Sequence, residues 1–285
     1  LQLKGDTLDL SDATTGARQV TVTAGSLDTS NGTLTSTGTQ AMILQVDRAL
    51  TNDGGTIAAN GAQQITAGSL SNIDGTLSAA GTGDTRINVR GTFDNTRGDV
   101  ASNGRQLQID AARLINEHGT LSHGGTESLS LTVGQLEGAK GTIVSAGALA
   151  LHAGAVDHRG ATLNATQLTV QAEAFNNQGG TVLATGAQAS SLTVSGVLDN
   201  GNGGTLASNG DLQITADTLG NADGTVQQAG TGTLAIDAHT LNGQGGTLLD
   251  SVAMQEAFFE AGGSSGLAAG LFTGGIALPH LAVRG

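Results

Sequence analysis

The sequence of 285 residues predicts an all-β protein, and within that class a parallel β-solenoid in which successive coils of the chain stack. Three observations lead to this prediction. A Gly-Thr-aliphatic motif recurs about every 21 residues, apolar and polar residues alternate between the motifs, and Gly and Asn gather where the alternation stops. No segment before Ser251 has a convincing helical periodicity. Because a unit of this length cannot bury an apolar face alone, neighbouring units must stack.

The Gly-Thr-aliphatic motif, with close variants, sets the repeat. Its single spacings range from 19 to 24 residues, but alternate motifs counted from Leu34 lie 42 to 44 residues apart. An extra residue at one corner is therefore offset by a missing residue at the next. Eleven motifs predict about eleven coils, and a rod of about 50 Å at the usual spacing of parallel strands. The aliphatic residues are Leu34, Ile57, Leu77, Val100, Leu121, Ile143, Leu163, Val182, Leu206, Val226 and Leu248.

Between the motifs, apolar residues alternate with polar ones, which indicates strands with one buried face. We expect two or three strands of three to five residues in each coil, separated by tight turns. A regular sandwich would give the same alternation but no fixed repeat over eleven cycles. The alternating apolar residues include Val20 and Val22, Leu44 and Val46, Ile87 and Val89, Leu107 and Ile109, Leu192 and Val194, Leu212 and Ile214, and Leu234 and Ile236.

A third element of each coil is an apolar residue followed closely by Asn, as in Leu70 with Asn72 and Phe93 with Asn95. Asn and Gly suit corners because they tolerate a positive φ or hydrogen-bond their own backbone. Stacked one per coil, the Asn amides could hydrogen-bond along the solenoid and satisfy the turn backbone. We expect this structural role for Asn52, Asn72, Asn95, Asn116, Asn177, Asn200, Asn221 and Asn242.

The composition restricts the function classes. The chain has 46 Gly, one Pro, five Phe and no Cys, Trp or Tyr, so a narrow and aliphatic interior is expected. The net charge of -13 argues against a nucleic-acid partner, which needs clustered Lys and Arg. Without Cys there is neither a disulfide scaffold nor a Cys-based zinc site, and the chain suits passage through a membrane unfolded. No signal peptide is recognisable at Leu1, so we expect an internal stretch of a longer protein.

No pattern in the sequence predicts catalysis, a cofactor or a metal site. The Asp residues mostly occupy corners, as do Asp74, Asp94, Asp199 and Asp223, where turn chemistry explains them. His118, His123, His152 and His158 lack an established ligand spacing, so solvent-facing or corner positions are expected for the six scattered histidines. The Gly-rich stretch 201–204 precedes no P-loop Lys and is expected to be a corner.

The repeat stops near Ser251, which predicts a solenoid region at residues 1–250 and a non-repeat cap or boundary segment at 251–285. Residues 252–260 are the first helix-like stretch. Residues 262–283 carry no Asp, Glu, Lys or Arg, but their six Gly, Pro279 and His280 argue against a membrane span. We therefore expect no stable span.

The repeats resemble those of filamentous haemagglutinin and related exoproteins of Gram-negative two-partner secretion systems, which include contact-dependent growth inhibition effectors. The stretches GGTLASNGDLQITADTL (203–219) and GGTIAANGAQQITAGSL (54–70) carry the resemblance, which covers residues 1–250. It implies a right-handed parallel β-helix that is exported through an outer-membrane transporter. It also implies a secreted, surface-displayed and non-enzymatic adhesin, with a cell-surface receptor or glycan as its partner. Because parallel β-helices also include polysaccharide lyases, a glycan-active enzyme is the alternative.

Overall fold

The computed structural model describes residues 1–250 and 282–284. The chain divides into two compact units, unit 1 (Leu1–Ala148) and unit 2 (Leu149–Gly285). Among the described residues every regular element is a β-strand, and the strands of each unit pair in parallel. Each unit is a parallel β-solenoid, and together they contain about eleven turns about 22 residues apart. The predicted fold class is confirmed.

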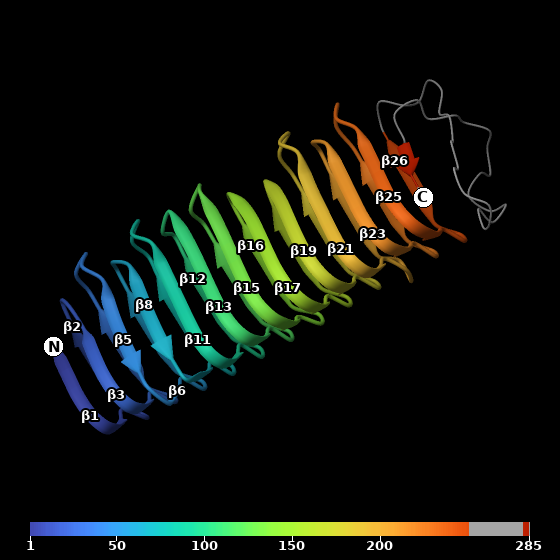
Figure 1. The fold of residues 1–285 in the computed structure, drawn as a ribbon. Helices are drawn as coiled ribbons and strands as arrows, with labels where there is room; N and C mark the ends of the chain where they lie inside the picture. Colours follow the sequence, from blue (N-terminus) through green and yellow to red (C-terminus); the bar gives the residue numbers. More distant parts are fainter. Residues whose placement is uncertain (251–281, 285) are drawn as a thin grey trace. The chain divides into compact units, whose positions relative to one another are not determined.

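Each coil of unit 1 gives a long strand or strand pair to a first sheet and a short strand to a second sheet (Figure 1). The first-sheet strands are β1 (Gln2–Asp9), β3 (Thr21–Asp28), β5 (Met42–Val46), β6 (Ala49–Thr51), β8 (Gln63–Ala67), β9 (Ser69–Ser71), β11 (Thr85–Asp94), β13 (Gln106–Ile115) and β15 (Ser128–Glu137). The second-sheet strands are β2 (Thr14–Ala17), β4 (Thr33–Ser36), β7 (Thr56–Ala59), β10 (Thr76–Ala79), β12 (Asp99–Ser102), β14 (Thr120–His123) and β16 (Thr142–Ser145).

Unit 2 repeats this arrangement. Its first sheet contains β17 (Ala148–Asp157), which begins at the last residue of unit 1, then β19 (Gln167–Asn176), β21 (Ser190–Asp199), β23 (Leu212–Gly220), β25 (Leu234–Asn242) and β27 (Ala282–Arg284). Its second sheet contains β18 (Thr162–Ala165), β20 (Thr181–Ala184), β22 (Thr205–Ser208), β24 (Thr225–Gln228) and β26 (Thr247–Asp250). Both sheets are parallel because the chain returns to the same face after every coil.

The interior consists of columns of equivalent apolar residues. In unit 2, Leu192 pairs with Ile214 and Ile214 pairs with Ile236, and none of the three is more than 1% exposed. The aliphatic residues of the repeat motif form a second column, in which Val182 pairs with Leu206 and Leu206 with Val226. Leu212 is also buried, whereas its neighbour Gln213 is exposed. The strand phase predicted from the alternation is confirmed at these positions.

The predicted strand length is wrong for most of the first sheet. Its strands reach ten residues because the chain stays in the sheet where a turn was expected, with a register shift in some strands and none between β13 and β15. Such shifts fall between Val89 and Thr92 in β11 and between Val194 and Val197 in β21. A bulge inserts a residue and bends the strand while the pairing on either side is kept. Among the described coils, those of β5–β6 and β8–β9 break the first-sheet strand in two.

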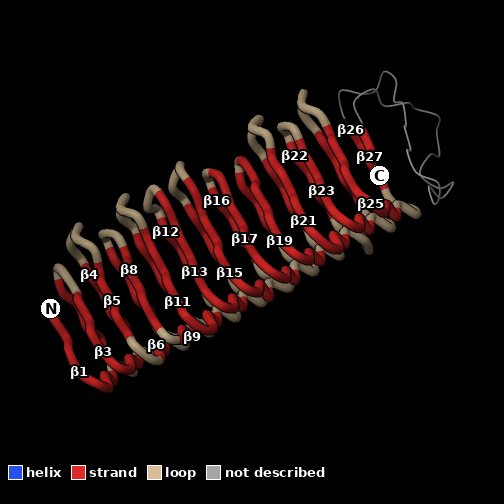
Figure 2. Tube along the Cα trace, viewed as in Figure 1, coloured by secondary structure: helices blue, strands red, loops and turns tan. Residues whose placement is uncertain are grey.

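Turns lie at both ends of the short second-sheet strands, as the tan segments in Figure 2 show for each unit. The expected helix-like stretch at 252–260 lies outside the described residues. So do the expected cap and the uncharged stretch that ends at residue 283, apart from β27. This strand pairs in parallel with β25. The part of the chain that the structure describes contains no helix that could span a membrane.

Candidate functional site

Within the described residues, a dense set of polar contacts lies in the turn that joins each first-sheet strand to the next second-sheet strand, here called the asparagine corner. Between β11 and β12 it consists of an outer carboxylate at Asp94, a fully buried amide at Asn95, and two turn residues before Gly98. The buried amide stands two residues after Phe93, the last inward-facing residue of its strand. Equivalent corners recur once per coil and stack on one another.

In unit 1 the buried amides form a hydrogen-bonded ladder. The Nδ2 group of Asn52 donates to Oδ1 of Asn72, that of Asn72 to Asn95, and that of Asn95 to Asn116, over 2.7, 2.7 and 2.8 Å. The ladder begins at Thr29, whose hydroxyl donates to Asn52 Oδ1 over 2.9 Å. It ends at Asn116, because the next corner places Gly138 at the equivalent turn position.

In unit 2 a second ladder has the same direction. His158 Nδ1 contacts Asn177 Oδ1 at 2.7 Å, and the chain of amides continues from Asn177 to Asn200 and from Asn200 to Asn221, each over 2.7 Å. The following corner has Gly243 at the turn position, so this ladder also ends at a glycine. Thr29 and His158 therefore start the two ladders with a donor that is not an amide. Their position two residues after Leu27 and Val156 is the signal that could have found them.

The amides also satisfy the backbone of their own corner. Asn72 Nδ2 approaches the carbonyl oxygen of Gly75 at 3.2 Å, and Asn95 Nδ2 approaches that of Gly98 at 3.0 Å. The same groups approach second-sheet carbonyls of the next coil, such as Thr120 O at 3.3 Å from Asn95. Buried carbonyls without a partner cost free energy, so each amide stabilises both its own turn and its neighbour.

Asn242 does not belong to the ladder. It follows Leu241 directly, pairs in register with Gly220, and is exposed. Its Oδ1 accepts a hydrogen bond from the Gln244 amide at 3.4 Å. Asn200 and Asn242 both precede a Gly-Gly-Thr by the same distance, so corner spacing alone cannot separate them. The distance from the last apolar residue of the strand does separate them, because Asn200 lies two residues after Leu198 and Asn242 lies one residue after Leu241.

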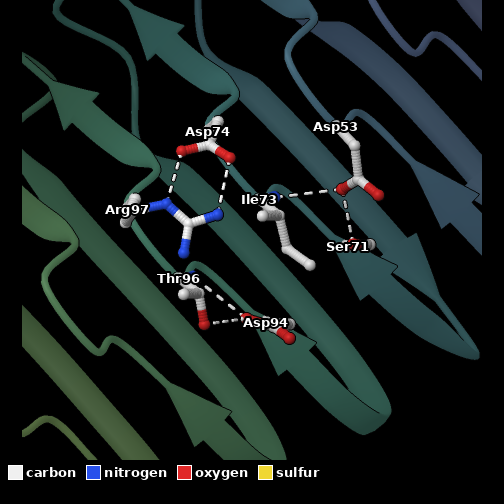
Figure 3. Close-up of polar contacts among 7 residues, drawn as sticks. All are labelled: Asp53, Ser71, Ile73, Asp74, Asp94, Thr96 and Arg97. Atoms are coloured by element: carbon white, nitrogen blue, oxygen red, sulfur yellow. Dashed lines mark hydrogen bonds and ion pairs between the residues drawn. The ribbon is translucent and has the colours of Figure 1, made fainter.

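The outer layer of the corner is made of carboxylate caps (Figure 3). Asp94 Oδ1 accepts hydrogen bonds from the amide and the hydroxyl of Thr96, over 2.9 and 2.6 Å. Ser71 occupies the equivalent place one coil earlier and has no carboxylate. There Asp53 reaches across from the preceding corner and accepts from Ser71 Oγ at 2.5 Å and from the Ile73 amide at 3.0 Å. This corner therefore keeps a carboxylate cap, although the carboxylate comes from the preceding corner.

Each corner also has a residue with a positive φ, which is a glycine at some corners and Asp, Asn, Arg, His or Lys at others. Asp74 and Arg97 both have φ of 54°, and the Arg97 guanidinium contacts both Asp74 carboxylate oxygens over 2.7 Å (Figure 3). This hydrogen bonding lowers the pKa of Asp74. The side-chain hydrogen bond from Ser11 lowers the pKa of Asp9, and that from Arg159 lowers the pKa of Asp157. A general acid at neutral pH needs a raised carboxyl pKa, so these three carboxylates suit capping rather than acid catalysis.

The expectation for the histidines is wrong in part. His118, His152 and His239 are exposed, but His123 and His158 are each only 1% exposed. His158 is a corner residue, whereas His123 ends β14, in the column of Ser102 and Ser145. Its ring fits there because backbone and hydroxyl oxygens surround it: Nε2 lies 2.9 Å from Gly104 O and Nδ1 lies 3.1 Å from Ser145 Oγ. His280 lies outside the described residues.

No group of three metal-ligating side chains occurs within residues 1–250 and 282–284. Repeated coils with buried amide ladders and capped outer carboxylates define a structural β-solenoid of the repeat class. The haemagglutinin repeat family model matches residues 1–41, 44–97, 82–135, 126–195 and 183–255, and the chain belongs to this family. It is a filamentous haemagglutinin-type repeat region, which indicates a structural, adhesin-type protein. No curated protein and no solved structure matches it.

Proposed function

We propose that the chain forms the stalk and the adhesive surface of a secreted filamentous haemagglutinin-like exoprotein. This exoprotein is displayed on a bacterial cell surface, where it mediates host-cell or cell–cell contact. The observation that supports this most directly is the equivalence of the coils. Leu163, Val182 and Leu206 pair in succession at one register position, and so do the residues that flank them. Interchangeable coils suit a protein whose contribution is reach and presentation, because nearest-neighbour stacking makes length additive.

The partners follow from the same proposal. Export is through an outer-membrane transporter of the two-partner type, and the absence of Cys from the chain suits unfolded passage. The displayed surface contacts a receptor or glycan on another cell, in virulence or in contact-dependent growth inhibition. Residues 1–250 form the stalk and 251–285 a cap or boundary segment. The pairing of β27 with the outer edge of β25 supports a segment that covers the last coil.

Deleting residues 164–206 tests the stalk function. The deletion joins Leu163 to Ala207 in register, removes two coils of unit 2, and brings His158 next to Asn221 in the ladder. Unit 2 should shorten by about 10 Å, at about 4.8 Å per coil, and still fold. Circular dichroism, small-angle scattering and cell binding of the full-length parent protein are the measurements. Binding should survive, because the lost coils repeat the surface of their neighbours.

A deletion of residues 164–205 is the matched control. It joins Leu163 to Leu206, so the following side chains change face and the shortened unit should not fold. If both deletions fold equally well, the coils are not interchangeable units. If the in-register deletion folds but abolishes binding, residues 164–206 hold a specific receptor surface and the spacer function is wrong. Cleavage of a uronate polymer that is lost with one Asp substitution would favour the lyase alternative.

A further inference from the structure

The two buried histidines differ in how their rings can accept a proton. Both ring nitrogens of His123 face an oxygen, Gly104 O on one side and Ser145 Oγ on the other. The Ser145 hydroxyl can donate to Nδ1 when the ring is neutral. When the ring is charged, the hydroxyl can turn to the Ala148 carbonyl, 3.2 Å away. Both charge states of His123 therefore keep their hydrogen bonds.

The surroundings of His158 suit only the neutral ring. Asn177 commits its Nδ2 group to Asn200 and to the carbonyls of Gly180 and Thr205, so its oxygen faces His158 and the hydrogen is on Nδ1. That leaves Nε2 with a lone pair, and this atom is buried without a hydrogen-bond partner. A proton added at Nε2 would be buried without a hydrogen-bond partner at that atom, and although a Thr162 backbone group favours the charged ring, burial of the charge is costly.

The groups packed around His158 do not compensate a charge. The Phe175 ring lies against it, with the two ring centroids 5.8 Å apart. The charged neighbours in unit 2 are Asp157 and Arg159, which pair with each other over 2.6 Å, and both remain partly exposed to solvent. Burial lowers the pKa of His158, and this effect outweighs the contributions of Asn177, a Thr162 backbone group and Asp157, which raise it.

We propose that His158 is an acid-sensitive switch in the first rung of the unit 2 ladder, at which proton uptake favours an opened coil over the folded one. The opened state binds the proton at the ordinary histidine pKa of 6.5, above the lowered folded value. Stability of the rung is therefore full above pH 6.5 and is lost as the pH falls below it. The switch is independent of the proposed stalk function, since it concerns the opening of unit 2 alone.

Hydrogen exchange of the Asn177 and Gly180 amides in the 285-residue chain tests the switch at pH 7.5 and 5.0, after correction for intrinsic exchange. The opening constant of the native chain should rise about 10- to 30-fold between these pH values. The upper value of about 30-fold holds if only the opened state binds the proton, because pH 5.0 lies about 1.5 units below the ordinary histidine pKa. His158→Asn supplies an amide that can donate to Asn177 and cannot titrate, so its rise should be absent. His123→Ser, which copies its column neighbours, should keep the rise.

The His158 ring itself gives a second measurement that needs no variant. In an NMR titration its signals should stay those of the neutral Nδ1–H form at pH values just below the ordinary histidine pKa of 6.5. A His158 ring that titrates near pH 6.5, or an equal rise in the opening constant of the native chain and His158→Asn, would overturn the proposal.

Discussion

Replacing Asn200 by alanine removes the central rung of the unit 2 ladder. Asn200 accepts from Asn177 over 2.7 Å, donates to Asn221 over 2.7 Å, and donates to the Thr225 carbonyl over 3.0 Å. The side chains of Asn177, Asn200 and Asn221 are fully buried. Alanine can replace none of the contacts. The Asn177 amide retains carbonyl contacts, but Asn221 Oδ1 loses its donor.

The expected loss follows from this count. Three hydrogen bonds contribute about 1 kcal/mol each, and a buried acceptor left without a donor costs about 1–3 kcal/mol more. Asn200→Ala should therefore lower the free energy of unfolding of unit 2 by about 4–6 kcal/mol. Urea unfolding followed by circular dichroism, with exchange of unit 2 amides to localise the effect, measures it.

Asn242→Ala is the matched control, because Asn242 lies at the same distance from its Gly-Gly-Thr but outside the ladder. Its exposed side chain accepts one 3.4 Å contact, so the change should stay within about 0.5 kcal/mol. Equal destabilisation by the two substitutions would refute the argument that the ladder, rather than corner chemistry in general, stabilises the coils.

Two further predictions concern the strands and the turns. Leu212→Asp should abolish cooperative unfolding of unit 2, because loss of a buried leucine costs about 2–5 kcal/mol and a buried carboxylate adds to this cost. Gln213→Asp should destabilise unit 2 only slightly, because Gln213 is exposed. Similar thermal melts for both variants would show that the strand phase is wrong. Lys140 has φ of 57° and is exposed. Because glycine adopts a positive φ without strain and a β-branched residue does not, Lys140→Gly should stabilise unit 1 and Lys140→Val should destabilise it, by about 1 kcal/mol each. Urea unfolding measures both changes. Identical midpoints for the two Lys140 variants would rule out backbone strain at this corner.

Much of the fold follows from the sequence because neighbours in the structure are equivalent positions one repeat apart. Ile214 pairs with Leu192 and Ile236 because the three residues occupy the same position in successive repeats. The inward columns can therefore be read from local alternation and spacing. The lengths of the first-sheet strands could not be read in this way, because the residues between their two halves, such as Gly134 and Gln135 in β15, are small or polar as they would be in a turn.

The candidate site was less accessible to sequence reasoning. Seven of the eight expected asparagines lie at the ladder position, but Asn242 lies one residue from it, and the first rungs at Thr29 and His158 went unnoticed. The buried position of His123 was also missed. A lone histidine in a polar stretch carries no sign of the backbone oxygens that a neighbouring coil will present to it.

The sequence by itself determined the solenoid, its repeat and the residues that face inward, because periodicity of apolar side chains reflects which surface must leave water. The tertiary structure alone decided which atoms meet at the corners. Asp53 caps the corner of Ser71 and Ile73 from the preceding coil, and the burial of His158 leaves Nε2 without a partner. These contacts depend on stacking at about 4.8 Å between coils. A difference of one residue in a turn changes which side chain enters the ladder, and only the assembled coils show it.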